Sequence, residues 1–238
     1  MLSLLPIALS AQKKSKIKYI IQQEDNIVVD ADLKDWKSEL KTIDSSYWSF
    51  NLAFSQGKLY ATVRVKDIKL KNEALRNGVF LNISYDDKKK DGAIFIFPKL
   101  DAELLSKFIV DEYKSQDFTD QQLLSSVKGY QVSGFSKILD GILSFNNEYD
   151  VKAYAKIEAD GSLIYESQIP LDLIKFKSEQ IAVQVGINTR YAQLIKMNKN
   201  NAVGVRSAPY GRMPVQQSPS LKNPYPVDTE VWFVGNLK

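Results

Sequence analysis

Two residue types that carry much of enzyme chemistry are missing from this chain of 238 residues: cysteine and histidine. Without cysteine there is no disulfide, no thiolate nucleophile and no thiolate metal ligand. Without histidine, serine–histidine hydrolysis, histidine-bound zinc or copper, and haem held by an axial histidine are excluded. A bound metal ion would need oxygen ligands, which points to Ca²⁺ or Mg²⁺.

Concentrated charge is also scarce. The formal net charge is +4, and Lys88–Lys90 is the only run of three basic residues. Nucleic-acid binding requires a concentrated basic surface, so we expect no nucleic-acid partner. Hydrophobic residues make up 44% and charged residues 25% of the chain, as is usual for a soluble globular protein. A chain of this length can bury one sizeable core.

The longest apolar run near the start of the sequence is Leu2–Leu9, which is too short to span a bilayer. Small residues follow at Ser10 and Ala11, so residues 1–11 are interpreted as the remnant of a signal peptide cleaved near Gln12. A basic segment before Leu2 is missing, and we therefore expect the true start upstream. The alternative is a buried first strand. The preferred interpretation predicts a periplasmic or cell-surface protein of a Gram-negative bacterium, without a transmembrane segment.

Two hairpins dominate the sequence pattern. In residues 47–67, apolar and polar residues alternate strictly on both sides of Ser55–Gly57, and residues 149–169 repeat the pattern around Asp160–Gly161. Alternation of period two indicates strands with one buried face, and glycine suits the turns between them. Similar runs at 79–85, 93–97, 130–135, 141–145, 181–187 and 230–234 bring the total to about ten short strands. The predicted fold is an all-β, antiparallel β-sandwich of jelly-roll-like type, formed as one domain by residues 12–238.

Helical patterns are confined to short segments. Leu104, Leu105, Phe108 and Ile109 have helical spacing, and Thr119 with Gln122 has the spacing of a capping box. These patterns predict a small helical insertion at about 101–127, between strands. Residues 33–46 are polar and irregular, and the proline-rich stretch 206–228 is expected to form a long surface loop.

Three segments, taken in order, resemble the family 9 carbohydrate-binding modules and the related DOMON-like sandwiches. Residues 29–36 (VDADLKDW) are similar to the family's opening "hydrophobic-Asp-Gly-x-Leu-x-Asp-Trp", and residues 58–67 (KLYATVRVKD) to its "x-Leu-Tyr" strand. The third segment is YESQIPL at 165–171 with VGIN at 185–188, which is similar to "Glu-x-x-Ile-Pro" followed by "Gly-Phe-Asn".

The resemblance implies a sandwich that binds sugar or is otherwise non-catalytic; some family members bind Ca²⁺. Relatives that bind haem use histidine or methionine ligands, and the missing histidine argues against that branch. Two features depart from the family pattern. Ala31 stands at the usual glycine, so the turn after Asp30 is expected to be built differently. The helical insertion is extra and could reshape a binding face.

Sugar-binding proteins pack pyranose rings on exposed aromatic faces and bind the hydroxyls with nearby polar groups. The ligand-binding candidates are Trp232, Tyr210, Arg212, Trp48 and Tyr85. Trp232, Tyr210 and Arg212 lie in or next to the proline-rich stretch, where binding residues on loops are common. Trp48 continues an apolar stripe and is more readily explained as a core residue. Trp36 and Glu166 are assigned structural roles.

For a metal, Asp30, Asp32 and Asp35 fall in one short stretch and could provide carboxylates to Ca²⁺. Solvated or capping aspartates are the more ordinary explanation of the same spacing.

Three functions remain open. The preferred one is a non-enzymatic, exported protein that binds carbohydrate or glycan at the cell envelope. The second is a structural or assembly protein of the envelope that has the same fold and a protein partner. The third is a glycosidase, which needs two carboxylates at a set separation in a cleft, and no sequence motif indicates such a pair.

Export leads to a direct prediction. Expressed from its natural upstream context, the mature protein should begin at or within a few residues of Gln12, which N-terminal sequencing would detect. Cytoplasmic protein that retains Met1 would contradict export.

Overall fold

The structure of this chain is a computed structural model that describes residues 19–100, 103, 119–203 and 222–237. The predicted signal peptide at 1–11 lies outside the described residues. So do residues 101–102 and 104–118, which make up most of the insertion predicted at about 101–127, and most of the proline-rich stretch, including Tyr210 and Arg212.

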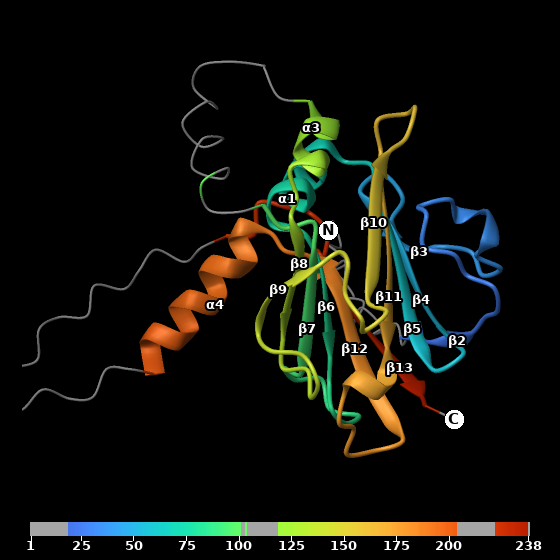
Figure 1. Cartoon of the computed structure of the whole chain (residues 1–238). Helices are drawn as coiled ribbons and strands as arrows, with labels where there is room; N and C mark the ends of the chain where they lie inside the picture. The colour runs from blue at the N-terminus through green and yellow to red at the C-terminus, as the bar shows by residue number, and fades with distance from the viewer. Residues whose placement is uncertain (1–18, 101–102, 104–118, 204–221, 238) are drawn as a thin grey trace, which may run out of the picture.

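Strands of the described residues form two sheets that face each other, which confirms the all-β sandwich (Figure 1). Sheet A has seven strands in the order β1-β13-β12-β6-β7-β8-β9, and sheet B has six, β10-β11-β5-β4-β2 with β3 paired to β4. The strands are β1 Tyr19–Ile20, β2 Gln22–Gln23, β3 Lys41–Asp44, β4 Trp48–Ser55, β5 Lys58–Val65, β6 Val79–Ile83, β7 Ala93–Phe97, β8 Gly129–Ser133, β9 Gly141–Ser144, β10 Lys152–Ile157, β11 Leu163–Pro170, β12 Gln180–Ile187 and β13 Glu230–Asn236.

The core lies between the two sheets and is built from alternate residues of their strands. In sheet B the register aligns Phe50, Val63 and Tyr165, all fully buried. Leu81 and Val185 are paired in the same way in sheet A. Apolar side chains from both sheets join one buried cluster. The alternation in the sequence therefore identified the inward faces correctly.

The sandwich is not purely antiparallel. β1 pairs with β13 of sheet A and β2 with β4 of sheet B, and both pairings are parallel. The chain crosses between the sheets at Ile21, whose N–H donates to the Val234 carbonyl at 2.9 Å. After Gln23 the chain runs over the outer side of sheet B, where it forms the 3-10 helix η1, Leu33–Asp35, and it then enters the sheet as β3, which pairs with β4 (Figure 1).

Two short helices close one end of the sandwich. α1, Ile68–Asn77, begins after Asp67, whose carboxylate accepts the Leu70 N–H at 2.9 Å. α3, Asp120–Ser125, begins with the predicted capping box of Thr119 and Gln122. An ion pair of 2.6 Å between Lys71 and Asp120 joins the two helices. A second 3-10 helix, η2, spans Leu171–Leu173.

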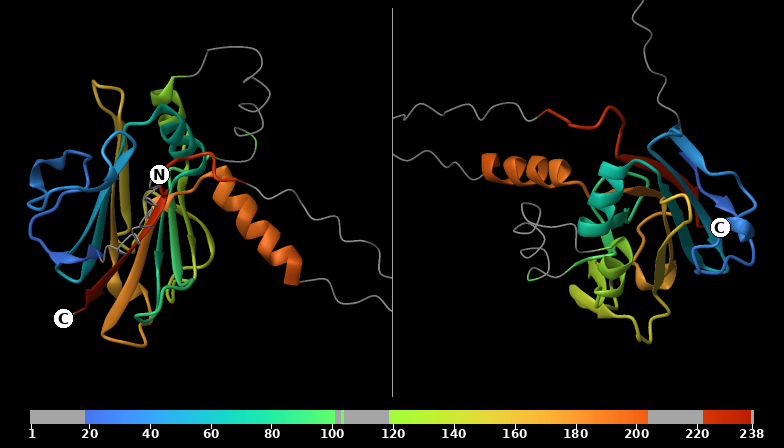
Figure 2. Two further views of the ribbon diagram at one scale, coloured as in Figure 1. Left: turned by 180° about the vertical axis from the view of Figure 1, so that it is seen from behind. Right: turned by 90° about the horizontal axis from the view of Figure 1, so that it is seen from above.

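The helix α4, Arg190–Val203, was not expected from the sequence. It projects away from the sandwich in every view (Figures 1 and 2). The Thr189 hydroxyl accepts the Ala192 N–H at 3.2 Å, so a helix-start signal was present. The segment has no clear apolar stripe, however, which is why periodicity did not reveal it. Within the described ranges, no helix is long and apolar enough to cross a membrane.

The position of Val63 provides a test of the core. Val63→Asp places an unpaired carboxylate between the sheets and should lower the free energy of unfolding by about 3 kcal/mol or more. The matched control is Lys66→Asp, because Lys66 is exposed just beyond the same strand. Urea unfolding of both variants measures the difference. Equal stability of the two variants would contradict the assigned faces.

Candidate functional site

One row of side chains on the outer face of sheet A combines an indole with two carboxamides. The register pairs Trp232 of β13 with Gln184 of β12, and Gln184 with Asn82 of β6. Their neighbours along each strand belong to the buried cluster, so these three side chains point away from the core. Trp232 is partly exposed, whereas Gln184 and Asn82 retain only 6% and 3% exposure.

Asn82 holds the charged turn at 86–92 against this face. Its Oδ1 accepts the Gly92 N–H at 2.9 Å, and its Nδ2 donates to Gln184 Oε1 at 3.1 Å. Within the turn, Asp86 accepts from Lys90 Nζ at 2.6 Å. Asn82 therefore orients Gln184, and the Gln184 amide nitrogen makes no hydrogen bond with another described residue. An amide held by the Asn82 hydrogen bond lies beside the indole.

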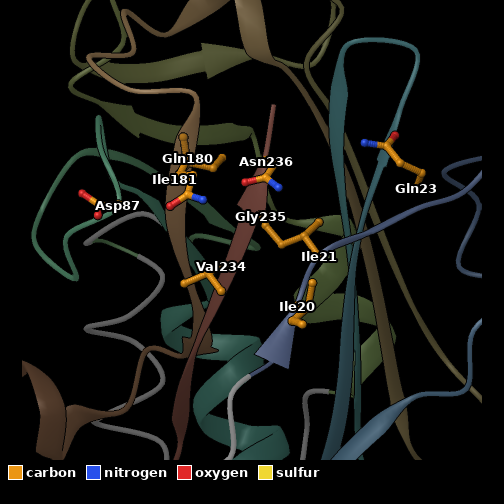
Figure 3. Close-up of a pocket in the computed structure, with 9 residues that line it drawn as sticks. All are labelled: Ile20, Ile21, Gln23, Asp87, Gln180, Ile181, Val234, Gly235 and Asn236. Atoms are coloured by element: carbon orange, nitrogen blue, oxygen red, sulfur yellow. The ribbon is translucent and has the colours of Figure 1, made fainter. Parts of the chain in front are cut away.

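A pocket of about 510 Å³ lies where β12 begins, β13 ends and the chain passes from β1 to β2 (Figure 3). Small-molecule sites commonly have volumes of roughly 300–1,000 Å³. The polar part of its wall consists of Gln23, Gln180, Asn236 and Asp87. No lysine or arginine lines it among the described residues.

Part of the pocket wall lies on the same face of β13 as Trp232, whereas Ile21, Ile181 and Gly235 line the pocket from the inward side. Val234, in the pocket wall, is two residues from Trp232, and its register partner Ile20 also lines the pocket. Side chains two residues apart on a strand project to one side, about 7 Å apart. Gln180 and Asn236 are paired across the two strands, and their side chains point to the same face of sheet A as Trp232. The surface thus offers apolar area, carboxamides that both donate and accept hydrogen bonds, and one carboxylate.

The other aromatic candidates have structural contacts. Trp48 is fully buried, packs on Phe50 with ring centroids 4.5 Å apart, and donates its indole N–H to the Asp228 carbonyl at 2.9 Å. Its ring is therefore not on a surface that a ligand can reach. Tyr85 is partly exposed, and its hydroxyl donates to the Gly134 carbonyl at 2.7 Å, next to the charged turn. The sequence-based candidates Tyr210 and Arg212 lie outside the described residues.

From the sequence, Trp232 was named as a candidate, but Gln184, Asn82 and the carboxamides of the pocket were not considered. These residues occupy the polar positions of strands with alternating sequence, and residues at such positions usually face water. Only the cross-strand register brings them beside Trp232, and no sequence motif encodes that register.

The three aspartates considered for calcium are each engaged locally. Asp30 Oδ1 accepts the Asp32 N–H at 2.7 Å, and Asp32 caps η1 and pairs with Lys34 Nζ at 3.0 Å. Asp35 Oδ2 accepts the Val28 N–H at 2.5 Å. In the part of the chain that the structure describes, no group of three or more acidic side chains could hold a metal ion. The Lys34 ammonium beside Asp32 disfavours a cation at that carboxylate.

Glu166 joins two of the segments that carried the family resemblance. It is 1% exposed on the outer face of sheet B, and the chain segment 24–38 covers it. Its Oε1 accepts the Trp36 indole N–H at 2.5 Å, and its Oε2 accepts the N–H groups of Ala31 at 2.7 Å and Asp30 at 3.1 Å. Trp36 and Glu166 thus have the structural roles that the sequence analysis assigned to them.

Ala31 corrects one expectation. Its φ of 59° lies in the left-handed region, and its side chain is fully buried. The turn is therefore not built differently from a glycine turn: alanine itself adopts the conformation that glycine favours. The two hydrogen bonds to Glu166 hold the backbone there.

Comparison with known proteins identifies no family for this sequence. A scan against models of protein families gives no match, and no curated protein matches. Among solved structures, the chain is similar to a family 9 carbohydrate-binding module from Caldicellulosiruptor kristjanssonii in complex with glucose. The identity is 14%, the TM-score is 0.34, and the alignment covers 74% of this chain and 81% of that chain. A similarity this distant identifies neither a ligand nor a family for this chain.

The burial of Glu166 predicts a pH dependence of stability. Burial raises its pKa from 4.5 to about 7, against the opposing effect of the N–H groups of Trp36, Ala31 and Asp30. The folded protein then binds this proton more tightly than the unfolded chain. The stabilisation of the folded state by the protonated Glu166 is fully present below pH 4.5 and is lost as the pH rises through 7. The free energy of unfolding should therefore increase on acidification from pH 8 to pH 5, by at most about 3 kcal/mol.

The matched variant is Glu166→Gln, which keeps the shape of the side chain and removes the titration. Since the chain has no histidine, few other groups change charge in this range. Urea unfolding at pH 5 and pH 8 should show a larger pH effect in the wild type than in the variant. An equal effect in both would mean that Glu166 remains charged throughout.

Proposed function

We propose that this protein is a non-catalytic module that binds carbohydrate on the outer face of sheet A. The ligand contacts Trp232 and Gln184 and extends toward the pocket lined by Gln180 and Asn236. The observation that carries the proposal is the register, which places a partly exposed indole beside an amide that Asn82 holds in position.

The chemistry of this surface matches a neutral, polyhydroxylated ligand. A sugar ring has a C–H face that packs on an indole, and its hydroxyls both donate and accept hydrogen bonds, as carboxamides do. Asp87 can accept from a hydroxyl. A phosphate or carboxylate ligand would call for lysine or arginine, which the described wall of the pocket lacks.

We also propose that the protein acts outside the cytoplasm, in the periplasm or at the cell surface. The support is the apolar run Leu2–Leu9 followed by small residues. Glycans are abundant in that location, so the two proposals are consistent with each other.

Tryptophan emission tests the site directly. The chain has three tryptophans, and Trp36 and Trp48 are only 8% and 0% exposed. Iodide should therefore quench mainly Trp232, and a bound sugar should protect it. The titration uses cell-wall and plant oligosaccharides with the wild-type protein. Trp232→Ala should weaken binding about tenfold through the lost stacking area.

Two controls make the result specific. Tyr154→Ala removes an aromatic ring of 50% exposure from the outer face of sheet B and should leave binding unchanged. Gln184→Met keeps the side-chain length without the amide and should weaken binding, measured by calorimetry. Binding that is equally strong in the Trp232 and Gln184 variants would contradict this site, and no binding by any sugar would contradict the function.

A further inference from the structure

A second pocket, of about 430 Å³, lies at the end of the sandwich where β4 turns into β5. Its wall comes from separate segments: Lys58 at the start of β5, Lys137 in the β8–β9 loop, Glu148, Tyr149 and Asp150 in the β9–β10 loop, and Pro170, Asp172 and Leu173 at the end of β11 and in η2. No part of the candidate site on sheet A contributes to it. The pocket therefore requires its own explanation.

Hydrogen bonds between these segments make the pocket rigid. The Leu171 N–H donates to the Gly57 carbonyl at 3.0 Å, and the Ser136 N–H to the Leu173 carbonyl at 2.9 Å. Gln168 Nε2 donates to the Asp150 carbonyl at 2.9 Å. Each contact joins different loops, so the pocket is held in shape before any ligand arrives. A preformed site loses little entropy on binding.

Two ion pairs line the pocket. Lys58 Nζ lies 2.6 Å from Asp150 Oδ2, and Lys137 Nζ lies 2.6 Å from Asp172 Oδ2. Lys152 also contacts Asp150, at 2.7 Å, and it lowers the pKa of Asp150 together with Lys58, so this carboxylate stays charged at neutral pH. All four pocket side chains remain partly exposed, between 27% and 68%.

These pairs leave hydrogen-bonding capacity unused. A lysine ammonium has three donors, and a carboxylate has about four acceptor positions. A hydroxyl pair of a ligand can accept from the lysine and donate to the aspartate without separating the two. Tyr149 adds a partly exposed aromatic ring, and Pro170 and Leu173 add apolar wall.

We infer that this pocket is a second saccharide subsite, in which Tyr149 packs against a neutral sugar ring and the Lys58–Asp150 and Lys137–Asp172 pairs bind its hydroxyls. The inference rests on the proposed function for its ligand class, but it concerns a separate place on the molecule. A charged ligand fits less well, because it would have to compete with an ion pair that is already formed. A neutral diol uses only the free donors and acceptors.

The test is an amide and indole chemical-shift titration by NMR with glucose, galactose, mannose, xylose and N-acetylglucosamine. At least one sugar should shift the amide signals of Lys58, Tyr149 and Asp172. The double variant Asp150→Asn, Asp172→Asn should weaken that binding about tenfold, since it removes two charge-assisted acceptors. Asparagine tolerates the left-handed conformation of Asp150, where φ is 56°, so the variant should fold.

Asp160→Asn is the matched control. It weakens a similar pair, with Arg64 at 2.7 Å, outside this pocket, and should not change the titration. Trp232→Ala should likewise leave the pocket shifts unchanged. If sugars shift the Trp232 indole and none of the pocket amides, the inference is overturned and the proposed function stands. Shifts at the pocket without any at Trp232 support the inference and overturn the site on sheet A. If no sugar shifts either site, both are overturned.

Discussion

Burial of alternate strand residues between two sheets is the constraint on which this structure depends. Phe50, Val63 and Tyr165 lie in one register row of sheet B and are fully buried. A shift of one residue in any strand would exchange these rings and methyl groups for polar side chains. Burial of the core therefore fixes the strand register. The same register determines which residues lie next to one another on the outer faces. The candidate site on sheet A is a consequence of the same register that builds the core.

The two outer faces are used differently. The segment 24–38 covers part of the outer face of sheet B, and the buried carboxylate of Glu166 holds it there through the Trp36 indole and two backbone N–H groups. On sheet A the partly exposed Trp232 lies beside Gln184. Trp232 is thus the partly exposed member of a row in which Gln184 and Asn82 are buried. Glu166 thus gives a structural role to the first and third segments of the family resemblance, because its hydrogen bonds join them.

Both pockets lie toward the same end of the sandwich. Gln23, in the first, pairs with Phe54 close to the β4–β5 turn, and Lys58, in the second, is the first residue of β5 after that turn. The first offers mainly carboxamides and the second offers ion pairs. Loops at the end of a rigid sheet scaffold can differ in chemistry without disturbing the core.

The sequence by itself determined the sandwich, the two hairpins and their inward faces, because alternation of period two is a local property of the chain. It also assigned Trp48 to the core, Trp36 and Glu166 to structural roles, and the capping box to Thr119. It did not reveal α4, whose segment has no clear apolar stripe, nor the left-handed conformation of Ala31, which the Glu166 hydrogen bonds support from 135 residues away. Only the tertiary structure placed Gln184 beside Trp232 and brought Lys58, Tyr149 and Asp172 to one pocket. Such contacts depend on strand register and loop packing between distant segments, and no local pattern encodes them.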